Sequence, residues 1–267
     1  MKQRIITGVI GAIAIILLLL ASETVIHVAV GIITLYGLFE MYKALNLHKN
    51  IPLLILNLLF GVVIFAYKWI PVAFVAPLVF GYIVLVFLMM LISGNTIKFS
   101  NVTLSTFMLI YIVFTMLHIV LLRYTPFGKY LIYLVLLGAC GTDIFAYFVG
   151  VLTGKHKLCP RISPKKTIEG AVGGFFGAIV CAVCFGLVMQ YAFKFNVNYV
   201  NLLILGAISG VLSEIGDLAA SMIKRQYAIK DYGHLLPGHG GIMDRLDSII
   251  FIAPLVYYFV NYLPVLG

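Results

Sequence analysis

Charge is scarce in this chain. Asp, Glu, Lys and Arg make up 10% of its 267 residues, whereas 63% are hydrophobic. Soluble domains carry about 25% charged residues, so this composition excludes an ordinary soluble protein. The four cysteines lack the partner ligands of a zinc site. A clear internal repeat is also missing, which argues against a transporter built from two matched halves. The sequence therefore predicts one integral membrane domain over residues 1–267.

Long apolar stretches support an all-α polytopic membrane protein. A bilayer core of about 30 Å requires about 20 apolar residues per helix. The first stretch follows Lys2 and Arg4 as a signal sequence would, but Ala-Ser-Glu after it is a poor cleavage site, so we expect an uncleaved span. We predict about nine transmembrane helices, at 5–21, 24–42, 51–67, 71–92, 102–122, 130–152, 171–193, 199–222 and 246–262.

The distribution of basic residues predicts the orientation. With the N-terminus in the cytoplasm, 14 of the 18 Lys and Arg residues fall in cytoplasmic segments. Nine spans then place the C-terminus on the opposite side, and the polar loops 153–170 and 223–245 face the cytoplasm. The compact size and the lack of a targeting extension lead us to expect a bacterial plasma membrane.

Carboxylates divide the chain into two halves. Glu23 and Glu40 lie near the ends of early spans, and the other seven acids all follow residue 126. We therefore expect residues 1–125 to be mainly scaffold helices and residues 126–267 to be the catalytic half. Ionisable residues at membrane depth are expensive and usually functional.

Asp143 and the loop after it are the first candidate site. Asp143 lies eleven residues before the helix end at Gly154, about 16 Å along the helix, and needs a cation, a metal or a proton there. In the loop, Lys165, Lys166 and Thr167 offer ammonium and hydroxyl donors to phosphate. The alternative is a basic loop that fixes orientation and touches lipid headgroups.

The end of the eighth span is the second candidate. Asp217, Ser221 and Lys224 share one helical face, with Glu214 one turn deeper. A carboxylate below a hydroxyl and an ammonium suits a metal–phosphate complex. Arg225 points elsewhere and can equally contact the lipid surface.

The segment 230–247 adds further candidates. Backbone N–H groups at Gly240 and Gly241, ahead of a helix, suit an anion. Asp244 and Asp247 either share a cation or cap the helix and pair with Arg245. Hard oxygen ligands without a His/Cys cluster indicate Mg²⁺ or another divalent cation.

Glycines recur on two of the predicted helices. Gly170, Gly173, Gly174 and Gly177 lie on one side of the seventh span, and Gly206 and Gly210 lie on the eighth. Close helix packing explains both sets, and such faces also leave a homodimer open.

The segment 221–247 resembles the signature of phosphatidate cytidylyltransferases, also called CDP-diacylglycerol synthases. The segment reads Ser-x-x-Lys-Arg-x-x-x-x-Lys-Asp-x-Gly-x-x-Leu-Pro-x-His-Gly-Gly-x-x-Asp-Arg-x-Asp. It matches the family's signature when one more residue is allowed between Gly233 and Leu236. Ser-Pro-Lys-Lys-Thr-x-Glu-Gly at 163–170 is similar to the family's second block. Asp-x-x-Ala-Tyr-x-x-Gly at 143–150 resembles a third, although Ile144 and Val151 depart from it.

The resemblance implies that CTP and phosphatidic acid react to give CDP-diacylglycerol and pyrophosphate, with a divalent cation. Membrane lipid is then a further partner, and nucleic acid is not. We expect Asp217 and Asp244 to be metal ligands, with Asp231, Asp247 and Asp143 as additional candidates. The expected phosphate contacts and substrate-binding groups are Ser163, Lys165, Lys166, Thr167, Glu169, Ser221, Lys224, Arg225, Lys230, His239, Gly240, Gly241 and Arg245.

Two other functions remain open at this point. A CTP-dependent lipid kinase would need similar metal and phosphate groups but would transfer the terminal phosphoryl group. A transporter of a phosphorylated solute would spread its polar residues over both leaflets, whereas here they cluster on the predicted cytoplasmic side.

Overall fold

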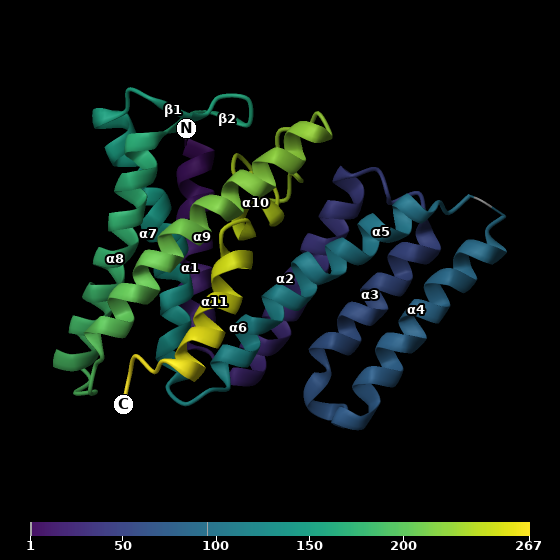
Figure 1. Ribbon diagram of the computed structural model, residues 1–267, viewed down its shortest axis with the longest axis horizontal. Coiled ribbons are helices and arrows are strands. Elements are labelled where there is room, and N and C mark those ends of the chain that lie inside the picture. The colour runs from purple at the N-terminus through teal and green to yellow at the C-terminus, as the bar shows by residue number, and fades with distance from the viewer. Residues whose placement is uncertain (1, 95) are drawn as a thin grey trace. The chain divides into compact units, whose positions relative to one another are not determined.

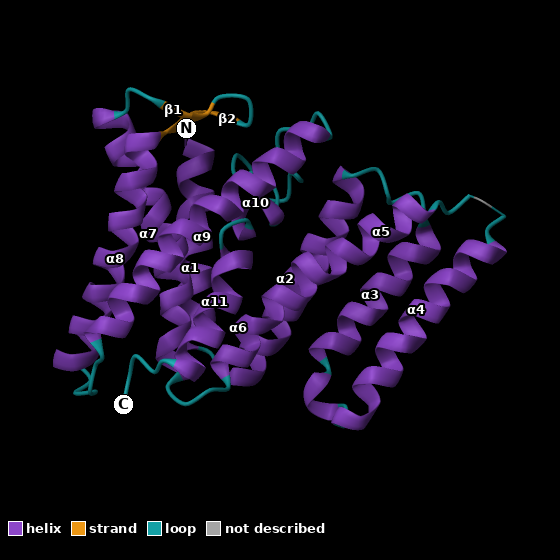
Figure 2. Cartoon of the chain, in the orientation of Figure 1, coloured by secondary structure: helices purple, strands orange, loops and turns teal. Residues whose placement is uncertain are grey.

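Helices dominate the structure, a computed structural model that describes residues 2–94 and 96–267, with side chains from residue 7 onward (Figure 2). The side chains of Lys2 and Arg4, used above for orientation, lie outside the described part. The α-helices are α1 (Lys2–Leu20), α2 (Glu23–Ala44), α3 (Ile51–Phe65), α4 (Val75–Ile92), α5 (Phe99–Met108), α6 (Thr115–Arg123), α7 (Gly128–Thr153), α8 (Ile168–Tyr191), α9 (Tyr199–Gln226), α10 (Met243–Leu246) and α11 (Ile249–Tyr262).

Each predicted apolar stretch is helical, but not all are long enough to be assigned as spans. Among the described residues, six helical segments are long and apolar enough to cross a membrane: Glu23–Ala44, Val72–Ile92, Phe99–Arg123, Gly128–Thr153, Ile168–Tyr191 and Tyr199–Gln226. Thr7–Leu20, Ile51–Phe65 and Ile249–Tyr262 are shorter apolar helices. The protein is thus a mainly helical membrane protein. The count of nine spans and the placement of the termini stay predictions.

Two of these segments are not uniform α-helices. Between α5 and α6 the chain forms a π-helical turn, η3 (Leu109–Phe114). Short 3₁₀ turns, η1 (Tyr67–Trp69) and η2 (Val72–Phe74), connect α3 to α4. The apolar stretch at 102–122 therefore predicts the course of the chain but not its local hydrogen bonding.

Packing divides the chain into two units. The first contains the residues up to Leu117 together with Asp231–Asp244, and the second contains His118–Lys230 and Arg245–Gly267. The signature segment therefore leaves the second unit after Lys230 and returns to it at Arg245.

In the first unit, α2 packs against α3 and η3, and α3 lies beside α4 and α5 (Figure 1). A buried polar cluster joins these helices. Asn57 donates to Tyr42 Oη at 2.5 Å and to the Ser105 carbonyl at 3.1 Å, and Tyr82 Oη donates to Asn57 Oδ1 at 2.8 Å. Such bonds hold helices together where lipid provides no hydrophobic drive.

In the second unit, α8 packs between α7 and α9, and α11 packs against α7 and α9. Glycines allow the close approach, as the sequence predicted. A Cβ at Gly206 or Gly210 would come within 2.9 Å of the α8 backbone, and one at Gly177 would overlap Phe145 of α7. These faces are filled within the chain, so they no longer argue for a homodimer.

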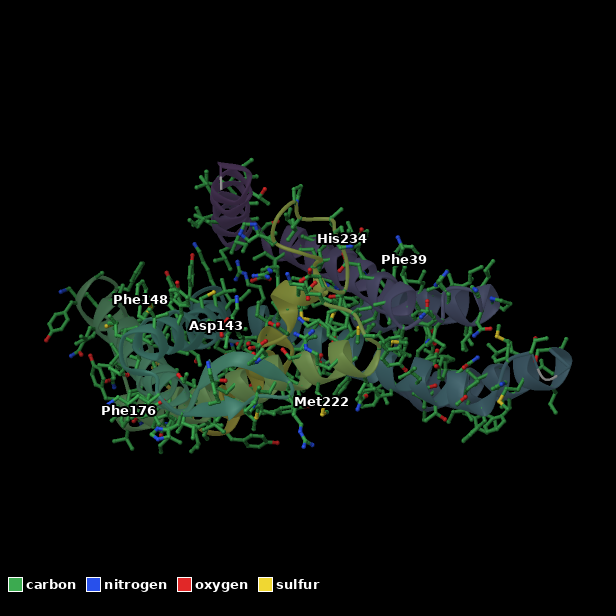
Figure 3. All side chains as sticks on the ribbon, turned by 90° about the horizontal axis from the view of Figure 1, so that it is seen from above. Phe39, Asp143, Phe148, Phe176, Met222 and His234 are labelled. Atoms are coloured by element: carbon green, nitrogen blue, oxygen red, sulfur yellow. The ribbon has the colours of Figure 1, made fainter. Side chains whose placement is uncertain are left out.

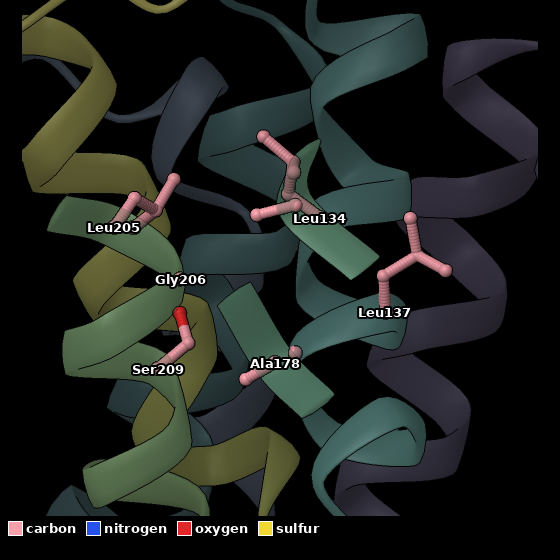
Figure 4. Close-up of a pocket in the computed structure, with 8 residues that line it drawn as sticks. Leu134, Leu137, Ala178, Leu205, Gly206 and Ser209 are labelled. Carbon is pink, nitrogen blue, oxygen red and sulfur yellow. The ribbon is translucent and has the colours of Figure 1, made fainter. Parts of the chain in front are cut away.

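A small apolar cavity remains between α7, α8 and α9 (Figure 4). It is lined by Leu134, Ala178, Leu205 and Ser209, among others, and its volume is about 10 Å³. That volume holds roughly one water molecule, so this cavity does not accommodate a lipid chain or a nucleotide.

The loop after α7 contains a structure that the all-α prediction did not include. Strands β1 (Lys157–Cys159) and β2 (Ser163–Thr167) form an antiparallel hairpin. The hairpin lies beyond the ends of α7 and α8 (Figures 1 and 2). Helix α7 ends at Thr153, before the first proline of the loop, and the chain then pairs with itself rather than staying irregular.

Candidate functional site

Lys166 is the centre of the polar cluster in the second unit. Its ammonium lies 2.6 Å from Glu214 Oε2 and 2.5 Å from Asp217 Oδ2. The three side chains are only 20%, 12% and 26% exposed. Burial by itself would lower the pKa of Lys166, but the Asp217 and Glu214 carboxylates outweigh it, and the pKa is raised. The ammonium therefore stays charged and draws two acids of α9 together.

The hairpin determines where Lys166 points. Lys165 is exposed while Lys166 is partly buried, as expected for neighbours on a strand. Thr167 then begins α8 as its N-cap, since its Oγ1 accepts the Gly170 N–H at 3.1 Å. At the other end of β2, the carbonyl of Ile162, the residue before the strand, accepts a hydrogen bond from Arg225 Nε at 3.1 Å. Both ends of β2 are thus anchored.

Asp217 interacts with more than Lys166. Its carboxylate is close enough to Asp143 of α7 and to Asp247 to repel both electrostatically. Ser221, one turn further along α9, lies 3.5 Å from Asp217 Oδ1, so its hydrogen bond is long. Acids from three separate sequence segments thus lie within electrostatic range of one another in the second unit.

Asp247 lies between α10 and α11, outside the apolar helices. Its burial, reinforced by Asp217, raises the pKa of the Asp247 carboxyl to about 7. Lys224 opposes this shift, and the Ser248 N–H donates to Asp247 Oδ1 at 2.9 Å. A cation bound here would favour the ionised form of this carboxyl.

The donor set of this cluster fits a hard divalent cation in its chemistry. Carboxylate oxygens are the ligands that Mg²⁺ prefers. In the described structure Lys166 supplies the positive charge, and no group of three or more His, Cys, Asp or Glu side chains among the described residues is arranged to hold a metal ion. The chain could offer Asp217, with Asp143 and Asp247 as its electrostatic neighbours.

The loop 231–244, in the first unit, is organised around Asp244. This carboxylate is 6% exposed, and its Oδ2 accepts the Tyr232 N–H at 2.8 Å and the Gly241 N–H at 3.0 Å. Gly240 has a φ of 82°, which favours glycine, and a Cβ there would crowd Asp244. Asp244 thus closes the loop, and the Gly241 N–H that sequence reasoning assigned to an anion is directed at this carboxylate.

Glu40 was missed by the sequence analysis. This α2 residue is 4% exposed and accepts the Met243 N–H through Oε2 at 3.0 Å. It was assigned to the scaffold half, yet it contacts the signature segment across 203 positions of sequence. The sequence feature that could have identified Glu40 is its position as a single acid at the predicted cytoplasmic end of the second span, on the same side as loop 223–245.

The other predicted residues are placed as follows. Glu169 binds the hairpin, with its Oε1 2.7 Å from His156 Nδ1. His239 is partly buried and packs near Gly8 of α1. Figure 3 labels Asp143 of the second unit and His234 of the first-unit loop (Figure 3). The partly buried side chains are those of Ser163 and Asp231, and the exposed ones are those of Lys165, Lys230 and Arg245.

Comparisons with known proteins show which family this chain resembles over its length. The model of the cytidylyltransferase family matches residues 2–263. The chain is 36% identical to a phosphatidate cytidylyltransferase of Bacillus subtilis over 97% of both chains. It is 34% identical to one of Staphylococcus aureus, over 96% of this chain and 97% of the relative. One from Staphylococcus epidermidis is 44% identical over 51% of this chain and 48% of its own length.

Proposed function

The chain belongs to the cytidylyltransferase family, and we propose that it transfers the cytidylyl group of CTP to phosphatidate. A phosphate oxygen of phosphatidate bonds to the α-phosphorus of CTP, and the bond from that phosphorus to the bridging oxygen of the β-phosphate breaks. The products are CDP-diacylglycerol and pyrophosphate. The observation that carries this assignment is the convergence of Lys166 of β2 with Glu214 and Asp217 of α9, two separate segments, in a chain that matches the family over its length.

The nucleophile needs little activation. A phosphate monoester has a second pKa near 6, so it is largely dianionic at neutral pH and requires no general base. The obstacle is the repulsion between two polyanions, and catalysis is then mainly positioning and charge neutralisation. Lys166, Lys224 and Arg245 supply positive charge in the second unit, and His239 offers a hydrogen bond to phosphate rather than a base.

We propose Mg²⁺ as the cofactor. Asp217 would hold it, with Asp143 and Asp247 as its neighbours in the second unit, and Asp231 and Asp244 stay candidates from the loop. When bound, the ion would neutralise charge on the α-phosphate and on the leaving pyrophosphate. The protein residues keep the carboxylates together and direct Lys166 at them.

We place the enzyme in a bacterial plasma membrane with its site toward the cytoplasm. Six membrane-length apolar helices and bacterial relatives support the first part. The second part follows from the excess of Lys and Arg in loops 153–170 and 223–245. A cysteine introduced at exposed Lys157 should react with a membrane-impermeant thiol reagent only after the membrane is opened.

The reaction is tested with purified protein in detergent, phosphatidate, Mg²⁺ and CTP labelled in the α- or γ-phosphorus. We expect α-label in the lipid and γ-label in pyrophosphate. Label from the γ-position in the lipid would indicate a lipid kinase instead. Flux of a phosphorylated solute into proteoliposomes without CTP would support a transporter.

The role of Asp217 is tested in the same assay. Asp217→Asn keeps the shape of the side chain but removes the charge that faces Lys166, and we expect it to abolish turnover while leaving membrane insertion intact. A folded Asp217→Asn enzyme with near-normal turnover would remove this residue from the metal site.

A further inference from the structure

Glu40 is an unusual residue for a scaffold helix. Its carboxylate is buried inside the first unit, where Oε2 accepts the Met243 N–H at 3.0 Å and the neighbouring Ile242 backbone also interacts with the carboxylate. Oε1 is buried and accepts no hydrogen bond from the described part of the chain. Burying a carboxylate with so few partners costs several kcal/mol. Stability alone therefore does not account for an acid at this position.

The loop 231–244 is built around this carboxylate. A Cβ at Gly233 or at Gly241 would overlap the Glu40 carboxylate, so both backbone segments lie directly against it. His234 interacts with Glu40 electrostatically, and Figure 3 shows it above the part of α2 that carries Phe39 (Figure 3). The carboxylate thus touches the loop near its beginning and near its end.

Asp244 joins the beginning and the end of the same loop. It accepts N–H groups from Tyr232 and Gly241, so the two carboxylates hold adjacent backbone positions at both ends of the loop. The two acids repel each other, which makes the arrangement costly. What the arrangement provides is a fixed path for the backbone that carries Asp231 and His239.

We propose that Glu40 is a positioning residue for the transfer reaction: it sets the path of loop 231–244 through Met243, Gly233 and Gly241 and so holds Asp231, His239 and Asp244 in place. This inference rests on the proposed function. It predicts that removing the oxygen acceptor impairs turnover even where the fold is kept.

The test compares two substitutions of similar length. Glu40→Gln retains an oxygen that can accept the Met243 N–H, whereas Glu40→Met retains the length and removes the acceptor. Glu23→Met, at the exposed start of the same helix, is the matched control. Each purified variant is assayed for kcat and for the KM of CTP per amount of folded protein, and thermal unfolding in detergent reports the folded fraction.

We expect Glu40→Met to lower kcat by about 10- to 100-fold, the usual loss when a group that orients a site is removed. Glu40→Gln should recover most of it, and Glu23→Met should match the wild type. Normal turnover in Glu40→Met would overturn the proposal. So would a loss in Glu40→Gln as large as that in Glu40→Met, since the hydrogen bond would then not be the cause.

A second variant covers the case in which Glu40→Met does not fold. Gly233→Ala disturbs the same contact from the loop side, and we expect a comparable loss of kcat, partly restored when Glu40→Asp shortens the opposing side chain. Folded Gly233→Ala with normal turnover would overturn the proposal. If the wild type itself forms no CDP-diacylglycerol, the proposed function fails instead, and the two failures are distinguishable.

Discussion

The Lys166 ammonium is expected both to stabilise the fold and to contact phosphate, and substituting Lys166 with Met should separate these two roles. The change removes a cation that lies 2.6 Å from Glu214 and 2.5 Å from Asp217 and leaves the two carboxylates facing each other. Removing one partner of a fully buried ion pair costs about 3–5 kcal/mol, and an exposed pair is worth about 0–1 kcal/mol. With side chains 12–26% exposed, we expect a loss of about 2–3 kcal/mol in the free energy of unfolding.

The loss of turnover in Lys166→Met should be larger than the loss of folding stability alone would cause. If Lys166 also contacts phosphate, its removal should lower kcat by about 100- to 1,000-fold, as for loss of a preorganised donor. Unfolding is followed in mixed micelles titrated with a denaturing detergent, and kcat is measured on folded protein. Lys165→Met is the control for stability, because Lys165 is exposed on the same strand. Unchanged unfolding and near-wild-type turnover in Lys166→Met would refute the reasoning.

Two further predictions concern pH and packing. The raised pKa of Lys166 means that the folded state holds this proton more tightly than the unfolded state, so the stabilisation is fully present below about pH 10.5 and is lost only as pH rises through the higher folded value. The difference in unfolding free energy between wild type and Lys166→Met should thus stay flat from neutral pH to that limit, and a decline near neutrality would contradict it. Gly210→Ala should destabilise the second unit by about 1–3 kcal/mol, because its Cβ would meet the Phe175 backbone. Gly81→Ala, with open space around it, should not destabilise, and equal unfolding of the two variants would show that the close approach is unimportant.

Hydropathy predicts the helices of this protein well, since a membrane helix is defined by its own composition. The stretch predicted at 24–42 corresponds to Glu23–Ala44. The stretch at 199–222 continues to Gln226 because Lys224 and Arg225 extend the helix beyond its apolar part. The hairpin was not predicted, because its strands of three and five residues carry no alternating apolar pattern.

The candidate site was predictable in its residue types but not in its pairings. Sequence spacing placed Asp217 and Lys224 on one helical face, since both belong to α9. It could not show that Lys166 would pair with Glu214, because that contact depends on how the hairpin returns to α9. Glu40 illustrates the same limit, since its partner Met243 is reached only through the tertiary fold.

The anchoring of β2 has a consequence for how this part of the chain can vary in length. Thr167 ties the strand to the start of α8, so the phase of Lys165 and Lys166 is set from that end. Gaining one residue between Lys166 and Thr167 would turn Lys165 inward and Lys166 outward. A change of length at Pro160 or Arg161, within the turn between Cys159 and Ser163, would leave the Ile162 and Thr167 anchors of β2 in place. Natural insertions and deletions should therefore collect in that turn, while the spacing from Lys166 to Gly170 stays constant.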